Sequence, residues 1–418
     1  MSGHTGSSPS VDIAAIRAQI PSTQKYLYLN SGWQGPSPRT VTQAVQDSFA
    51  AEAEAPTAPP LNEYRLAIFR RARQAIASLI GASPHEVSLQ QNTTEGINIV
   101  LAGLRFQPGD EIITCSYEHS SVIVPAYITR DRAGATLKIV RLSPDDSAAQ
   151  IVGKFEEALT PALKLIFVSH ISYATGQRLP IRELAELAHA RGGYLLLDAA
   201  QSAGQLPLDV GELGCDFCAF PGHKWLLGPA GTGALYLRRE LIPLLDSAKA
   251  SHHVSSYYNF KDRFQSKGDT IDKFELTTVS VPLLAGLNAA IDFISQIGLE
   301  VVEDRALSLA RYATERLAGV PGVRLVSAGA AERVSSGLVS FSLPNVAATV
   351  LTAYLWERSQ VVARTVPDAA CTRLSLHVFN TEEEVDAAVD AVASAAANGV
   401  PEKDYPSIQL EADAMTEL

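Results

Sequence analysis

The sequence contains few cysteines and no apolar run long enough to cross a membrane. Its four cysteines, in 418 residues, are too few and too irregularly spaced for a disulfide framework. We therefore expect a reducing, cytoplasmic location. The longest apolar pieces, such as Ile97–Leu104, fall well short of the ~18–20 residues that a bilayer requires. The first ten residues are polar and rich in glycine and serine, unlike a signal peptide.

The sequence also lacks any block of basic residues. Its 34 lysines and arginines stand against 45 aspartates and glutamates, which gives a formal net charge of −11. A field of this sign repels phosphate polymers and anionic lipid surfaces. Hydrophobic residues make up 46% and charged residues 19%, as in packed globular proteins rather than disordered ones. We expect a small-molecule partner, and neither nucleic acid nor a membrane.

Short β-branched runs alternate with helical patterns between about residues 85 and 240, which is typical of a mainly parallel sheet with crossover helices. The predicted strands are Glu86–Gln90, Glu111–Cys115, Leu137–Val140, Leu163–Ser169, Tyr194–Asp198, Phe217–Phe220 and Gly233–Leu237. A helix predicted over Arg182–Arg191 should stop at the following glycines. After an apolar helix near Pro282–Ile297 the pattern changes, with further strands expected at Gly337–Ser342 and Leu374–Val378.

These patterns predict an α/β protein with a large and a small domain. Residues 1–10 are expected to be disordered, and residues 11–40 to pack on the small domain. The large domain is assigned to residues 41–295 and a smaller C-terminal α/β domain to residues 296–400. The polar segment 401–418 forms a tail that is either disordered or docked.

Two polar pieces follow predicted strands in the middle of the chain. Asp198 ends an apolar strand, and ligands bind at such strand ends in open α/β sheets, although a carboxylate there can equally cap a helix or anchor a loop. Lys224 follows the strand ending at Phe220. A strongly hydrated amine at a packed strand end favours chemistry such as Schiff-base formation.

Two more pieces gain meaning from their neighbours. The stretch Gln90–Ile97 runs from a strand into a helix, where backbone N–H groups and the hydroxyls of Thr93 and Thr94 would hold a phosphate. An ordinary helix cap explains the same residues. His119 follows the strand ending at Cys115, and a single histidine there is more often a structural hydrogen-bonding residue.

Together these pieces resemble, in order and spacing, the class V aminotransferases. That family of pyridoxal-phosphate enzymes includes the cysteine desulfurases and the cyst(e)ine C–S lyases. The resemblance extends from residues 28–32 to residues 379–386 and is most specific at residues 198–201 (Asp-Ala-Ala-Gln) and 222–224 (Gly-His-Lys). It implies fold type I, pyridoxal 5′-phosphate as cofactor, an amino acid substrate and a homodimer.

The resemblance also implies roles for single residues. Lys224 is expected to form the Schiff base, Asp198 to contact the pyridine nitrogen, Gln201 the ring hydroxyl, and His119 to stack on the ring. Phosphate ligands are expected to be Thr93, Thr94, His223 and, across a dimer interface, Thr278. Arg373 is expected to bind the substrate carboxylate, with Arg364 as a second candidate whose alternative is a surface ion pair. Asn30, Gln34 and Tyr173 are further substrate-binding candidates.

The sequence departs from the desulfurase pattern in the loop between the two arginines. Only residues 366–372 separate Arg364-Thr365 from Arg373, which is too short for a mobile loop carrying a nucleophilic thiol. Cys371 is therefore expected to border a strand and to be structural. Cys215 and Cys218 have metal-like spacing, but nothing completes four ligands, and strand alternation would point them to opposite faces. We expect no metal.

Other departures favour the C–S lyase branch. Tyr173 stands where desulfurases usually carry asparagine, and Pro221 where they carry a phosphate-binding serine. The stretch Gly32–Gly35 is similar to a glycine-glutamine element of the lyases. The leading hypothesis is β-elimination from an S-substituted cysteine or cystine, giving a thiol or persulfide, pyruvate and ammonia. The alternatives are decarboxylation with oxidative deamination, cysteine desulfuration, transamination, epimerisation, and a non-catalytic cofactor-binding subunit. Trp33 and Tyr173 are either an aromatic wall for a bulky S-conjugate or core residues.

Overall fold

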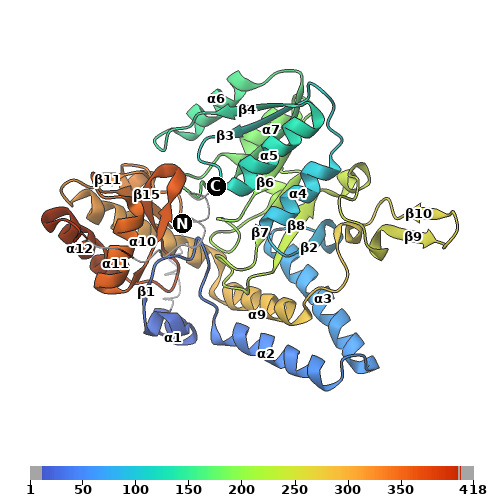
Figure 1. Cartoon of the computed structure of the whole chain (residues 1–418), viewed down its shortest axis with the longest axis horizontal. Coiled ribbons are helices and arrows are strands. Elements are labelled where there is room, and N and C mark those ends of the chain that lie inside the picture. Colours follow the sequence, from blue (N-terminus) through green and yellow to red (C-terminus); the bar gives the residue numbers. More distant parts are fainter. Residues whose placement is uncertain (1–11, 403–404, 406–418) are drawn as a thin grey trace, which may run out of the picture.

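The central sheet of the protein is mixed but mainly parallel, as predicted. The computed structural model describes residues 12–402 and 405, so the expected disorder of residues 1–10 and most of the tail 401–418 lie outside the described residues. The sheet order is β2-β8-β7-β6-β5-β3-β4 (Figure 1). Its strands are β2 (Val87–Gln90), β3 (Glu111–Cys115), β4 (Thr136–Val140), β5 (Leu163–Ser169), β6 (Tyr194–Asp198), β7 (Phe217–Pro221) and β8 (Gly233–Leu237). Only β8 runs antiparallel to both its neighbours, and the predicted strand bounds are correct to within one residue.

Both faces of this sheet are covered by helices, which explains why its strands are apolar throughout. The side chains of β6 point alternately to the two faces of the sheet. Leu195 and Leu197 pack in one core with α3 (Pro59–Leu79), α6 (Ala148–Ala158) and α7 (Ile181–His189). Leu196 packs in a second core with α4 (Thr93–Gly103) and α5 (Ser120–Ala133). The helix predicted at Arg182–Arg191 is α7. The polar residues at the strand ends lie at one edge of the sheet.

The smaller unit begins where α9 (Val281–Ile297) meets α10 (Leu299–Ala318) at an angle of 75°. Gly298 lies between them at φ 92°, a conformation that favours glycine. The unit has an antiparallel sheet in the order β11-β12-β15-β14, built from β11 (Arg324–Leu325), β12 (Leu338–Ser342), β14 (Arg364–Val366) and β15 (Cys371–Ser375). Helices α10, α11 (Ala348–Ser359) and α12 (Glu382–Asn398) cover it.

The strand predicted at Leu374–Val378 is displaced in the structure, because β15 begins at Cys371 and ends at Ser375. The N–H of Leu376 makes one more bond beside β12, to the carbonyl of Gly337. The N–H of His377 then donates to the side chain of Asn380, three residues further along the chain. This local turn ends the strand although the apolar pattern continues.

The N-terminal segment connects the two units. Strand β1 (Leu27–Tyr28) pairs with β13 (Val361–Val362) of the smaller unit, whereas α2 (Arg39–Glu54) packs on α9 of the large one. Helices α1 (Ile13–Gln19) and α8 (Val210–Leu213) complete the α-helices of the described residues. Short 3-10 helices occupy Pro21–Gln24, Pro84–Glu86, Arg239–Leu244, His252–Val254, Ile271–Phe274, Ala331–Arg333 and Pro367–Ala369.

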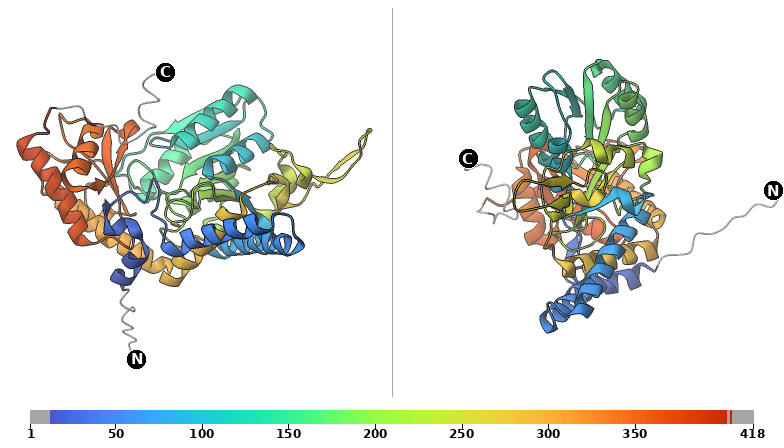
Figure 2. Two further views of the ribbon diagram at one scale, coloured as in Figure 1. Left: turned by 60° about the horizontal axis from the view of Figure 1, so that its bottom comes forward. Right: turned by 90° about the vertical axis from the view of Figure 1, so that its right-hand side faces the viewer.

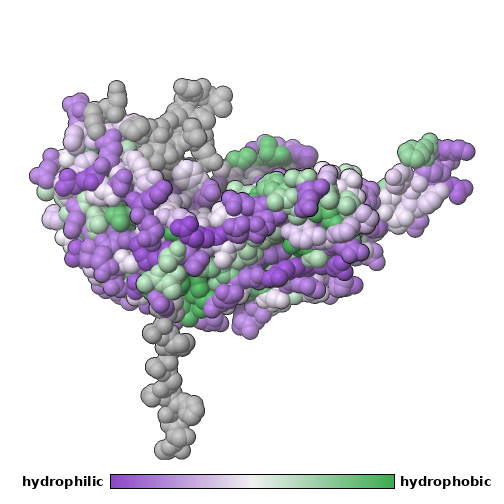
Figure 3. Space-filling view, turned by 90° about the horizontal axis from the view of Figure 1, so that it is seen from below, coloured by the Kyte–Doolittle hydropathy of each residue, from purple (hydrophilic) through white to green (hydrophobic). Residues whose placement is uncertain are grey.

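A hairpin of β9 (Ser255–Tyr258) and β10 (Phe264–Ser266) projects from the large unit (Figure 2). Apolar surface marks the end of this projection (Figure 3), where the side chain of Phe260 is 99% exposed. Among the described helices, no single one combines the length and apolar composition of a membrane span; α9 and α10 meet that test only when taken together across their bend.

Candidate active site

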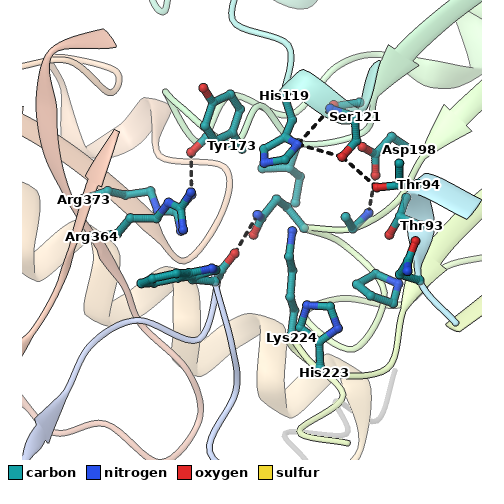
Figure 4. Close-up of a pocket in the computed structure, with 18 residues that line it drawn as sticks. Thr93, Thr94, His119, Ser121, Tyr173, Asp198, His223, Lys224, Arg364 and Arg373 are labelled. Carbon is teal, nitrogen blue, oxygen red and sulfur yellow. Dashed lines mark hydrogen bonds between the residues drawn. The ribbon is translucent and has the colours of Figure 1, made fainter. Parts of the chain in front are cut away.

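A cavity of about 220 Å³ lies where the strand ends of the large unit face the smaller unit. Ten of the thirteen site residues predicted from the sequence line it, and Figure 4 labels nine of them. They are Thr93, Thr94, His119, Tyr173, Asp198, Gln201, His223, Lys224, Arg364 and Arg373. They come from α4, the loops after β3, β5, β6 and β7, and the β14–β15 hairpin. The fold thus joins pieces that are far apart in the sequence.

One end of the cavity offers donors suited to a phosphate. Asn92 caps α4 by accepting from the N–H of Glu95 at 2.9 Å, so the ordinary capping interpretation is correct. Thr93 and Thr94 still line the cavity in the first helical turn, where N–H groups have no helical acceptor. The buried Nδ1 of His223 has no hydrogen-bond partner there, and burial next to Lys224 lowers the pKa of that histidine to about 4.

The middle of the cavity holds a histidine, an aspartate and a lysine. His119 begins α5, and its Nδ1 accepts from the N–H of Ser121 at 3.1 Å, which leaves the hydrogen on Nε2. Burial, with the charge of Lys224 adding to it, lowers the pKa of His119 to about 3, so its ring is neutral. Asp198 accepts from the N–H of Ala200 at 2.8 Å. Burial raises the pKa of Asp198, whereas the nearby charge of Lys224 lowers it.

Gln201 connects this centre to the N-terminal segment. Its Nε2 donates to the carbonyl of Gly32 at 2.8 Å, and its Oε1 accepts from the indole of Trp225 at 2.9 Å. A β-carbon on Gly32 would lie 2.8 Å from the hydroxyl of Ser375 and 3.0 Å from Nη2 of Arg373. Glycine therefore allows the segment to approach both units closely.

Two arginines form the opposite end of the cavity. Arg364 and Arg373 are directly paired across β14 and β15. Arg373 is 1% exposed, and its Nη1 donates to the carbonyl of Tyr173 at 2.7 Å, while its Nε and Nη2 have no partner. Burial and the charge of Arg364 lower the pKa of Arg373 to about 9. The guanidinium of Arg364 lies 4.5 Å from the ring centre of Trp33. Two adjacent buried cations, one of them with open donors on Arg373, suit a carboxylate.

Three predicted site residues lie outside this cavity. Gln34 is exposed, and its carbonyl accepts from the hydroxyl of Tyr28 at 2.6 Å. Asn30 is buried and donates to the carbonyl of Ala363 at 3.5 Å. Thr278 lines a separate hollow of about 700 Å³, so a role at the phosphate requires another copy of the chain.

None of the four cysteines lines the cavity or forms a disulfide. Cys371 is fully buried at the start of β15, where it packs near Tyr173, and burial raises its pKa to about 11. The prediction that Cys215 and Cys218 point to opposite faces is wrong. Cys215 precedes β7, its thiol donates to the carbonyl of Val210 at 3.8 Å, and both cysteines lie in one hydrophobic core. Within the described ranges, no three His, Cys, Asp or Glu side chains are grouped to hold a metal ion.

Sequence reasoning missed two polar residues of this region. The hydroxyl of Ser121 lies 2.8 Å from that of Thr94 and 3.0 Å from Nδ1 of His119, and so joins two ends of the cavity. Its position two residues after His119, in the first turn of a helix, is the signal that could have found it. Asp368 accepts a hydrogen bond from the hydroxyl of Tyr173, and no local sequence signal predicts this pairing.

These groups fit pyridoxal phosphate. The first turn of α4 and the unpartnered Nδ1 of His223 provide donors for a phosphate, and the buried Asp198 carboxylate suits a protonated ring nitrogen. The flat, neutral ring of His119 can lie against an aromatic ring. Lys224 extends into the middle of the cavity (Figure 4), where its amine can meet an aldehyde carbon.

Comparisons with known proteins identify the family to which the chain is similar. The sequence profile described as Aminotransferase class-V matches residues 27–388. A probable cysteine desulfurase of Methanothermobacter thermautotrophicus is 30% identical over 391 residues, covering 88% of this chain and 94% of the relative. Isopenicillin N epimerase of Streptomyces clavuligerus is 34% identical over 375 residues, covering 87% and 93%. A structure of the cystine C–S lyase C-DES with cysteine persulfide has a TM-score of 0.84 at 28% identity, covering 90% of this chain and 99% of that one.

Proposed function

This chain belongs to the aminotransferase class-V family and is a pyridoxal-phosphate-dependent enzyme. We propose that it cleaves the bond between the β-carbon and the sulfur of an S-substituted cysteine or cystine by β-elimination. The products are a thiol or persulfide, pyruvate and ammonia. The cystine C–S lyase C-DES, whose structure is similar, supports this choice.

The observation that carries the proposal is the absence of a thiol from a cavity that holds the other expected groups. A desulfurase needs a nucleophilic cysteine that reaches the substrate sulfur. In this chain the cysteine nearest to the arginines in sequence, Cys371, is fully buried with a raised pKa. The loop that would carry such a cysteine is the tight turn Pro367–Ala369. Without a protein acceptor, the sulfur leaves on a small molecule.

Each residue of the cavity has its own role in this reaction. When bound, pyridoxal phosphate supplies the carbonyl carbon that the substrate amine joins and a ring that takes up electron density from the α-carbon. Lys224 would hold the cofactor through its amine and, when that amine is free, would act as the general base toward the α-proton. The carboxylate of Asp198 keeps the proton on the ring nitrogen. Arg373 holds the substrate carboxylate through its unpartnered Nε and Nη2, and the neutral ring of His119 covers one face.

The test is to incubate the cofactor-loaded protein with cystine, several cysteine S-conjugates and sulfur-free amino acids. Pyruvate and thiol formed in equal amounts, and lost in Lys224→Ala, would support elimination. Carbon dioxide or an aldehyde without pyruvate would instead indicate decarboxylation. Racemisation of the α-carbon without other products would indicate an epimerase, the activity named for the relative from Streptomyces clavuligerus. A cofactor spectrum that no amino acid changes would indicate a non-catalytic subunit.

We also propose that the protein is a cytoplasmic homodimer. The absence of disulfides among its four cysteines supports a reducing location. Thr278 lines a hollow that is separate from the active-site cavity of the same chain, which supports a dimer interface at that hollow. Mixing Lys224→Ala subunits with Thr278→Ala subunits tests this, because the hybrid has one site with both residues intact. Activity regained after mixing would support the dimer, and mixtures as inactive as their components would contradict it.

A further inference from the structure

Tyr173 is attached to the β14–β15 hairpin at both its ends. Its carbonyl accepts from Nη1 of Arg373 at 2.7 Å, and its hydroxyl donates to the carboxylate of Asp368. Its ring, which is 4% exposed, packs with Val366 and Cys371 of the same hairpin. Because Tyr173 belongs to the loop after β5 of the large unit, one residue joins the two units beside the cavity.

The hairpin turn is built to present Asp368 in a fixed position. Pro367 restricts the backbone at its start, and the N–H of Ala370 closes the turn on the carbonyl of Pro367 at 2.9 Å. Ala370 itself has φ 46°, a left-handed conformation that is unfavourable for a residue other than glycine. A short, constrained turn between two paired arginines leaves little freedom for the carboxylate.

The same contacts connect the turn to the groups that line the cavity. Arg364 and Arg373 flank the turn on β14 and β15. The ring of Tyr173 meets that of His119 edge to face, with centres 5.0 Å apart. Burial and the neighbouring Asp368 carboxylate raise the pKa of Tyr173 far above its ordinary value, so the hydroxyl remains a donor.

We propose that Asp368 is a positioning residue that, through the hydroxyl of Tyr173, holds the β14–β15 hairpin against the large unit, so that both arginines meet the substrate carboxylate from a fixed position. The inference rests on the proposed function only in taking an amino acid carboxylate as the ligand. Asp368 does not line the cavity, so it acts through Tyr173 and not on the substrate.

The direction of the change in KM distinguishes a positioning role of Asp368 from a purely electrostatic effect of its charge. Removing a carboxylate close to two arginines makes their surroundings more positive, which by itself strengthens carboxylate binding. Loss of positioning of the two arginines weakens carboxylate binding. We expect Asp368→Ala to raise KM about tenfold, equivalent to ~1.4 kcal/mol, close to the lower limit of ~1.5 kcal/mol for a hydrogen bond to a charged group. The accompanying change in kcat should be smaller.

Tyr173→Phe removes the same bond while keeping the ring and its packing. The double variant should raise KM no further than either single variant, because both remove one interaction. Asp145→Ala is the matched control. Asp145 also joins the two units from an exposed position, through Arg333 at 3.2 Å, but neither residue lines the cavity. Its KM should equal that of the wild type.

Hydrogen–deuterium exchange of the cofactor-loaded protein provides a readout independent of turnover. Amides of residues 364–373 should exchange faster in Asp368→Ala and Tyr173→Phe than in Asp145→Ala. Binding of glycine, followed through the cofactor absorbance, should weaken in parallel. If no cysteine derivative reacts, these two measurements still test Asp368 while the elimination proposal fails. A lower KM, additive effects in the double variant, or unchanged exchange would each overturn the positioning role.

Discussion

Gly35 packs directly on the backbone of Lys224, and a single added methyl group should disturb both stability and cofactor binding. A β-carbon at this position would lie 2.1 Å from the carbonyl oxygen of Lys224 and 2.6 Å from Cδ2 of Leu227. The N–H of Gly35 is also held by the carbonyl of His223 at 2.7 Å. Overpacking typically destabilises by ~1–3 kcal/mol, and we expect the upper end because the obstructing atom belongs to the backbone.

This loss can be measured by thermal unfolding of Gly35→Ala. With an unfolding entropy of roughly 2.1 cal/mol/K per residue, a loss of ~3 kcal/mol in a chain of this length lowers Tm by about 3 °C. The apparent Kd for pyridoxal phosphate should rise at the same time, because the displaced backbone carries Lys224 and His223.

Gly153→Ala is the control for the same chemical change. Gly153 lies within α6, and its added β-carbon would meet no atom within 4 Å. Replacing glycine by alanine inside a helix should stabilise the protein by ~0.5–1 kcal/mol, with no effect on cofactor affinity. A Gly35→Ala protein with the Tm and cofactor affinity of the wild type would refute the packing argument.

Two other predictions concern charged groups of the site. Arg373→Gln should raise KM for the amino acid about 10–150-fold, as expected for loss of a charged hydrogen bond of ~1.5–3 kcal/mol; steady-state kinetics with an unchanged KM would exclude Arg373 as the carboxylate ligand. Glu118 accepts from the N–H of Ser169 at 2.9 Å, and burial raises its pKa from 4.5 to about 7. The folded carboxyl keeps a proton that the unfolded chain releases, so its contribution to stability is lost as pH rises through this range. Urea unfolding at pH 5.5 and 8 should show a weaker pH dependence in Glu118→Gln, and equal dependence in both proteins would contradict the raised pKa.

Predictions of secondary structure were correct where a local sequence pattern is compatible with only one structure. Apolar runs bounded by turn residues located the strands of the large sheet, because both of its faces are buried. Asp198 and Lys224 follow such runs, so their place at the same edge of the sheet followed from strand ends alone. The prediction for β15 failed because the apolar pattern does not show where pairing stops. Strand β15 ends at Ser375, and the N–H of His377 is taken up by the side chain of Asn380, three residues further on.

Local patterns in the sequence therefore determined the strands of the α/β sheet, and the resemblance to the class V aminotransferases supplied the cofactor and the candidate site residues. Tertiary structure decided which of those residues meet. Only pairing of β14 with β15 places Arg364 opposite Arg373, and only contact between the two units brings Asp368 to Tyr173, 195 residues away in sequence. The physical reason is that side-chain periodicity fixes which face of an element is buried, whereas the partner across that face is set by the packing of the whole chain.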